Sequence, residues 1–298
     1  MREIRIPAFA KVNLRLDILG KRSDGFHELR TIFQTVSLHD ELRLRTSRRS
    51  GISLTIQGNE SLSQEPFRNN LVYKAVDALR RELKVRSGVE IELRKKIPAG
   101  RGLGGGSSDA AAALLGYLRL TNCSIPFPKL LAIASSLGAD VPFFLLGGRA
   151  LGIGKGDEIY PLPDIPKRSV LIISPRAVHV PTSDAYRWLK APALTKMRSA
   201  HTLFEFCALC RSSQWNGLSN DFERAVFQRH PGLAAIKRAL LRAGASEASL
   251  AGSGSAVFGV FPSPALARRA AVGFPDDHAL VCETLSRDRY LRLVQGAR

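Results

Sequence analysis

Five of the seven residues from Gly100 to Gly106 are glycines, and two serines and a run of alanines follow them. The stretch comes after an alternating apolar segment, Val89 to Leu93, and precedes a helical pattern over Ser107 to Leu120. Backbone N–H groups without neighbouring Cβ atoms can converge on a ligand, and a helix start adds unpaired N–H groups and a positive dipole end. Strand, glycine loop and helix therefore predict an anion site, most plausibly for phosphates.

Two common phosphate-binding motifs do not fit this loop. A Walker A loop ends in a lysine followed by Ser or Thr, whereas this loop ends Gly106-Ser107-Ser108. A dinucleotide fingerprint can be traced from Gly100 to Gly105, but it requires an acidic residue about 20 positions later. The segment from Ala110 to Ala139 contains no Asp or Glu. For the helix itself, Ser107 or Ser108 is the expected N-cap, with Asp109 in the first turn.

The whole chain predicts an α+β protein in two lobes. Its 298 residues and 45% hydrophobic content can form one large domain or two medium ones. The opening is rich in strands, and Gly51 suggests a hairpin between strands 42–46 and 52–56. The proline-rich segment Tyr160 to Pro166 predicts a domain boundary. The N-terminal domain would then cover residues 1–160 and the C-terminal domain residues 161–298.

The charge of the chain indicates an anionic partner. Its formal net charge is +18, but aromatic residues make up only 7%, so we do not expect a nucleic-acid partner. The first residues lack the apolar run of a signal peptide, and no apolar stretch reaches the roughly 18 residues that span a bilayer. We expect a cytoplasmic protein without a membrane partner, as a monomer or weak dimer. Cys207 and Cys210 form a CxxC without a second ligand pair, so no metal site is predicted.

Four further blocks of sequence accompany the loop: Ala10-Lys-Val-Asn-Leu14, Ser23-Asp-Gly-Phe-His-Glu-Leu29, Gly138-Ala-Asp-Val-Pro142 and Ala251-Gly-Ser-Gly-Ser-Ala256. In this order, over residues 10 to about 260, the blocks resemble those of the GHMP small-molecule kinases. The resemblance implies an N-terminal lobe like domain 2 of ribosomal protein S5 and a ferredoxin-like α/β C-terminal lobe. The first two blocks are most similar to the branch whose acceptor is a cytidine diphosphate carrying a branched methyltetritol, phosphorylated at its 2-hydroxyl.

The resemblance also implies roles for individual residues. ATP is the expected phosphoryl donor, with Mg²⁺ accompanying it. The expected catalytic pair is Lys11 and Asp140: the carboxylate accepts the proton of the attacking hydroxyl, and the ammonium orients it. The expected ATP-binding residues are Pro98, Gly100, Gly102, Leu103, Gly104, Gly105, Gly106, Ser107 and Ser108, with Asn70 and Lys95 beside the adenine. The expected acceptor-binding residues are Asn13, Phe26, His27, Thr182, Tyr186 and Gly252.

Two alternative functions follow from the same residues. Another GHMP kinase would act on a mevalonate-type or homoserine-type acceptor, although such relatives are expected to lack the Asp24-Gly-Phe-His27 block. More distantly, an S5-like lobe and a positive charge could serve an RNA-binding protein. Such a protein needs neither Lys11 nor Asp140.

Overall fold

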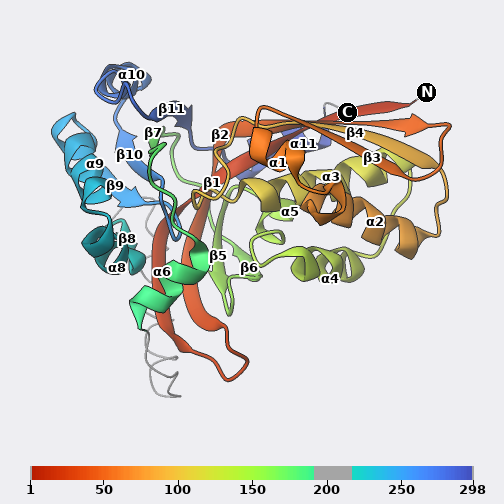
Figure 1. Ribbon diagram of the computed structural model, residues 1–298, viewed down its shortest axis with the longest axis horizontal. Coiled ribbons are helices and arrows are strands. Elements are labelled where there is room, and N and C mark those ends of the chain that lie inside the picture. The colour runs from red at the N-terminus through yellow and green to blue at the C-terminus, as the bar shows by residue number, and fades with distance from the viewer. Residues whose placement is uncertain (1, 191–216, 297–298) are drawn as a thin grey trace.

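The computed structural model describes residues 2–190 and 217–296, and within these the chain forms two sheets with helices packed against them (Figure 1). The first sheet has the order β3-β4-β2-β1-β8, with β5 paired to β2 and β6 to β5. Its strands are β1 (Glu3–Lys21), β2 (His27–Ser47), β3 (Ile52–Gln57), β4 (Gly88–Arg94), β5 (Arg149–Ile153), β6 (Glu158–Pro161) and β8 (Ser219–Asn220). The second sheet has the order β11-β7-β10-β9. Its strands are β7 (Ser169–Ser174), β9 (Glu247–Leu250), β10 (Val257–Phe261) and β11 (His278–Glu283).

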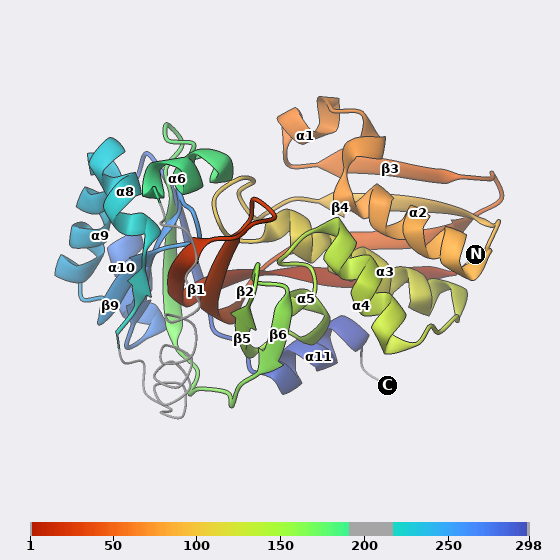
Figure 2. The same ribbon diagram turned by 90° about the horizontal axis from the view of Figure 1, so that it is seen from below.

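Helices of the first lobe cover one face of the first sheet (Figure 2). They are α2 (Leu71–Leu83), α3 (Gly105–Thr121) and α4 (Phe127–Leu137), with the short helices α1 (Glu60–Gln64), η1 (Phe67–Asn69) and α5 (Phe143–Leu146). The alanine run of α3 is buried against β1 and β2, where its small side chains allow close packing. The second lobe contains α6 (Thr182–Leu189), α8 (Phe222–Arg229), α9 (Pro231–Arg242) and α10 (Pro264–Ala271), and the last helix is α11 (Arg287–Gln295).

The two lobes meet through opposite faces of one buried strand. Side chains alternate across β7, so Val170 and Ile172 pack with the middle of β1, whereas Leu171 and Ile173 pack under the helices of the second lobe. All four are fully buried. This alternation explains why β7 reads as a continuous apolar run. It also places the second sheet against the central part of β1 and β2, the two long strands that extend into both lobes (Figure 1).

The two-lobed α+β architecture is confirmed, and its second sheet has the antiparallel order of a ferredoxin-like fold. Segments that follow residue 160 also contribute to the first lobe. Strand β8 returns to pair in parallel with β1, and Tyr290 of α11 is buried in the core of the first lobe. The proposed CxxC at Cys207 and Cys210 lies outside the described residues.

Two local predictions are wrong. The strands on either side of Gly51 do not form a hairpin, because β4 lies between them, antiparallel to β2 and parallel to β3. A turn residue between two apolar runs cannot reveal that a strand from later in the chain inserts there. Helix α3 begins at Gly105 with Gly104 as its N-cap, so neither serine caps it and Asp109 lies beyond its first turn.

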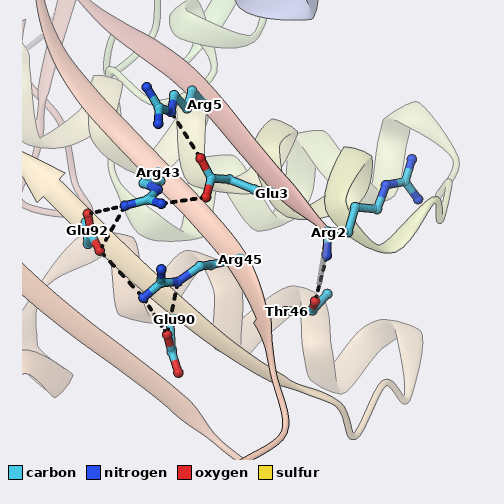
Figure 3. Close-up of polar contacts among 8 residues, drawn as sticks. All are labelled: Arg2, Glu3, Arg5, Arg43, Arg45, Thr46, Glu90 and Glu92. Atoms are coloured by element: carbon cyan, nitrogen blue, oxygen red, sulfur yellow. Dashed lines mark hydrogen bonds and ion pairs between the residues drawn. The ribbon is translucent and has the colours of Figure 1, made fainter.

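Some arginines of this positively charged chain pair with glutamates (Figure 3). On the exposed face of β1, β2 and β4, Arg43 lies 2.7 Å from a carboxylate oxygen of Glu3 and also pairs with Glu92, while Arg45 lies 2.9 Å from Glu90. Arg43 and Glu92, and likewise Arg45 and Glu90, are directly opposed on neighbouring strands, where unlike charges favour pairing. Among the helices of the described residues, none is both long and apolar enough to cross a membrane.

Candidate active site

A cleft of about 1250 Å³ is lined by residues of both lobes. All the predicted site residues line it except Ser108, whose side chain is buried in α3. The structure thus brings together residues as distant in sequence as Lys11, Gly104, Asp140 and Gly252.

The glycine loop lies against backbone from the second lobe. Gly102 has φ of +79°, and a Cβ there would lie only 1.9 Å from the carbonyl oxygen of Ala251. Gly104 has φ of +70°, and its Cβ would meet the ring of Phe144 at 2.9 Å and Cγ of Lys11 at 3.0 Å. Both positions therefore require glycine for conformation and for space. The close approach fixes the loop beside both Lys11 and the 250–256 segment.

The first turn of α3 offers unpaired backbone donors to the cleft. Its N-cap, Gly104, has no side chain to cap the helix, and no cap hydrogen bond from a side chain is formed within residues 2–190 and 217–296. The first N–H groups of this 17-residue helix therefore lack intrahelical or capping partners. Gly105, Gly106 and Ser107, which carry them, line the cleft. An uncapped helix start after a glycine loop can bind an anion, and the phosphate site expected from the sequence stays a prediction.

Strand β1 carries Lys11 into the cleft. The register with β2 shifts on either side of Lys11, between residues 9 and 11 and between residues 13 and 15, and such bulges re-aim side chains. The backbone N–H of Lys11 donates to the carbonyl oxygen of Leu103 at 3.0 Å, which ties the strand to the glycine loop. Its buried ammonium donates to Oδ1 of Asn13 at 2.8 Å, and Nδ2 of Asn13 donates to Thr31 at 2.7 Å. The ammonium is therefore held in one orientation.

Asp140 faces this ammonium from the loop after α4. Its Oδ2 lies 3.4 Å from Nζ of Lys11. The two side chains differ in exposure: Lys11 is 5% exposed and Asp140 31%. The carboxylate can therefore reach a bound ligand, while the ammonium behind it is fixed by the protein. This geometry brings a potential proton acceptor and a positive charge to the same point of the cleft.

An aromatic wall, formed by His27, Tyr186 and Phe222, also lines the cleft. The rings of His27 and Tyr186 stack with centroids 4.5 Å apart, and Tyr186 packs edge-on against Phe222 at 4.9 Å. Burial raises the pKa of Tyr186 to about 12, with a smaller contribution from the nearby charge of Asp140. Burial, with the charge of Lys21, lowers the pKa of His27 and so favours a neutral imidazole.

Other predicted acceptor residues border this wall. Phe26 is 57% exposed at the cleft, with the ammonium of Lys155 over its ring at 4.7 Å. Thr182 shares a hydrogen bond of 3.0 Å with Ser253, next to Gly252. A flat, half-hydrophobic surface beside a neutral imidazole can stack a nucleobase and hydrogen-bond its edge.

Asn70 and Lys95, the predicted adenine neighbours, line the cleft but their side chains also bond to the protein. Oδ1 of Asn70 accepts from the N–H of Val72 at 2.9 Å and caps α2. The buried ammonium of Lys95 pairs with Asp109 at 2.6 Å and with Asp40.

The cluster formed by Lys95, Asp40 and Asp109 was not predicted, because its members come from three separate segments: the residues after β4, strand β2 and helix α3. Burial raises the pKa of Asp109, and the charge of Asp40 adds to this effect, although the ammonium of Lys95 opposes it. One ammonium thus balances two buried carboxylates directly beneath the glycine loop.

Within residues 2–190 and 217–296, no group of three or more His, Cys, Asp or Glu side chains could hold a metal ion. A metal in this cleft would therefore take most of its ligands from water and from phosphate oxygens. Mg²⁺ commonly binds in this way.

Comparisons with known proteins identify the family of this chain. The family of GHMP kinases N terminal domains matches residues 70–148, and that of GHMP kinases C terminal domains matches residues 193–277. A 4-diphosphocytidyl-2-C-methyl-D-erythritol kinase of Solibacter usitatus is 45% identical, over 99% of this chain and 93% of the relative.

Two solved structures share the fold. One is a 4-(cytidine 5'-diphospho)-2C-methyl-D-erythritol kinase, with a TM-score of 0.77 and 35% identity over 94% of this chain and 99% of the other. The second is a homoserine kinase from Cytophaga hutchinsonii, with a TM-score of 0.73 and 24% identity over 96% of this chain and 95% of the other. At that identity the second likeness concerns the fold alone. The glycine cradle between two lobes, both domain matches and the near full-length relatives lead to one assignment: this chain belongs to the GHMP kinase family.

Proposed function

We propose that this protein transfers the γ-phosphoryl group of ATP to the 2-hydroxyl of 4-diphosphocytidyl-2-C-methyl-D-erythritol, giving the 2-phosphate and ADP. This reaction belongs to the non-mevalonate route to isoprenoid precursors. The observation that carries the proposal is the arrangement of one cleft. An anion cradle, a lysine–carboxylate pair and an aromatic wall with a neutral histidine all line it.

Two groups of residues in the cleft suit the two substrates. The glycine loop and the start of α3 would bind the ATP phosphates by backbone N–H groups, because Gly102 and Gly104 leave no side chain in the way. The rings of His27 and Tyr186, with Phe26, would take the cytosine. Stacking holds any base, so selection of cytosine would depend on hydrogen bonds from His27. Asn13, Thr182 and Gly252 would border the tetritol between them.

Phosphoryl transfer depends mainly on positioning and on neutralising charge. Asp140 would accept the proton of the attacking hydroxyl, since its carboxylate is the partly exposed member of the pair. Lys11 would keep that carboxylate oriented and would stabilise negative charge that develops on the transferred group. The hydrogen bonds from Lys11 to Asn13 and from Asn13 to Thr31 hold the ammonium in position. When bound with ATP, Mg²⁺ would supply further charge neutralisation at the phosphate oxygens.

The acceptor can be tested by measuring ADP release from Mg-ATP with the cytidine compound, mevalonate, homoserine or buffer. The expected result is turnover with the cytidine compound alone. Turnover with mevalonate or homoserine would instead assign another acceptor to the same fold. RNA binding that survives the loss of both Lys11 and Asp140, without any ATP turnover, would contradict a kinase function altogether.

A further inference from the structure

One cation of the cleft, Arg101, has no role in the reaction described above. It lies between two glycines of the phosphate loop and is half-buried between the lobes. Its Nη1 donates to Oγ of Ser255 at 2.8 Å, and that hydroxyl donates to the carbonyl oxygen of Val178 at 2.6 Å. The carbonyl oxygen of Arg101 accepts from the N–H of Ala256 at 3.2 Å. Both the backbone and the side chain of Arg101 are therefore held by the second lobe.

Among the described residues, the charge of this arginine has no carboxylate partner. In the part of the chain that the structure describes, no Asp or Glu oxygen forms an ion pair with it, unlike Arg43 and Arg45 on the outer face of the sheet. Burial lowers the pKa of Arg101, and no neighbouring anion offsets this effect. A partly desolvated cation without a counter-ion is unfavourable, and such groups are commonly stabilised by an anion that binds there.

The guanidinium is also oriented by hydrogen bonds in a way that suits an anionic ligand. Ser255 directs its proton to Val178 and so presents a lone pair to Nη1, which fixes the plane of the fork. The remaining guanidinium N–H groups stay available, since one hydrogen bond to a side chain is formed within the described residues. A planar fork of charged donors suits the oxygen atoms of a phosphate.

We propose that Arg101 binds a phosphate group of a substrate in the cleft, and that Ser255 acts as the positioning residue for its guanidinium. The inference rests on the proposed function, in which both substrates carry phosphates: the triphosphate of the donor and the diphosphate of the acceptor. The chemistry of the contact is the same for either source. Arg101 thus adds a charged side-chain contact to a loop that otherwise binds through its backbone.

Calorimetric titration can test the contact without turnover. The ligands are adenosine and a non-hydrolysable ATP analogue for the donor, with cytidine and CDP for the acceptor. The variants are Arg101→Met, which keeps the length but removes the charge, Arg101→Lys, which keeps the charge, and Ser255→Ala. Arg119→Met is the matched control, because Arg119 also makes one hydrogen bond, of 2.7 Å to the carbonyl oxygen of Val294, and does not line the cleft.

Arg101→Met is expected to weaken a phosphate-bearing ligand by roughly 10- to 100-fold while leaving the affinity for its nucleoside unchanged. Arg101→Lys and Ser255→Ala should weaken the affinity for that ligand less, and Arg119→Met should leave it unchanged. A loss confined to the ATP analogue assigns the contact to the donor, and a loss confined to CDP assigns it to the acceptor. Equal losses for nucleoside and nucleotide, or unchanged affinity for all four ligands, would overturn the proposal. If the wild-type protein binds neither cytidine nor CDP, the proposed acceptor fails, while the adenosine arm still tests Arg101.

Discussion

Replacement of Gly102 by alanine should separate the phosphate loop from the second lobe. At this residue φ is +79°, and the added methyl group would lie 1.9 Å from the carbonyl oxygen and 2.8 Å from the carbonyl carbon of Ala251. The N–H of Gly254 would lie at 3.2 Å. All three contacts are with backbone, so no side-chain rotation can relieve them.

The size of the effect follows from these distances. A non-glycine residue with left-handed backbone costs about 1 to 2 kcal/mol in folding free energy. In addition, the 1.9 Å contact must open to the 3.4 Å of ordinary van der Waals contact, a displacement of about 1.5 Å. A misplacement of about 1 Å near reacting groups can lower a rate by about 100-fold. We therefore expect kcat/KM for ATP to fall by about 100-fold in Gly102→Ala.

Gly244→Ala is the control that separates the cost of left-handed backbone from the displacement of the glycine loop. Gly244 has φ of +97°, but nothing lies within 4 Å of its added Cβ. Both variants should lose stability in urea unfolding, but only Gly102→Ala should lose kcat/KM in steady-state assays of ADP release. If the two variants retained the same kcat/KM, contact between the glycine loop and Ala251 would not position the phosphates, and this reasoning would be refuted.

Three further variants test the site and its surroundings. Asp140→Asn should leave ATP affinity nearly intact and lower turnover by about 100-fold or more in single-turnover assays, and unchanged turnover would remove Asp140 from the mechanism. Lys95→Met should reduce the free energy of unfolding by about 3 to 5 kcal/mol in urea titrations, since it leaves two buried carboxylates without their cation, whereas a loss below about 1 kcal/mol would contradict that role. The pKa of His27 is lower in the folded state than in the unfolded state, so the folded state binds fewer protons as the pH falls below about 6.5. The contribution of His27 to stability is therefore present above that pH and is lost on acidification. Tm measured at pH 7.5 and 5.5 should therefore fall more for wild type than for His27→Asn, and equal falls would contradict the assignment.

Local features of the site were predictable from sequence because their causes are local. The strand, the glycines and the start of α3 are contiguous, so the anion cradle follows from residues 89–120 alone. The exact N-cap was not predictable. Serine usually caps better than glycine, but the left-handed turn at Gly104, with Phe144 and Lys11 packed against it, starts the helix earlier than the serines would.

Features that depend on distant segments were not predictable from pattern. The insertion of β4 between β2 and β3 depends on pairing across about 40 residues. The buried cluster of Lys95, Asp40 and Asp109 and the contact from Arg101 to Ser255 join segments that nothing in the sequence relates. Lys11 and Asp140 could be paired only through the resemblance to a family, since a lone lysine on a strand and an aspartate after a helix are individually common.

The most direct test of the account is to follow the γ-phosphoryl group itself. Purified protein would be incubated with Mg-ATP labelled at that group and with 4-diphosphocytidyl-2-C-methyl-D-erythritol, and the product would be analysed by mass spectrometry and phosphorus NMR. We expect the label to move to the 2-hydroxyl of the tetritol in wild type and the transfer to be lost in Asp140→Asn. Label that stays on ATP, or that appears only as inorganic phosphate, would contradict it.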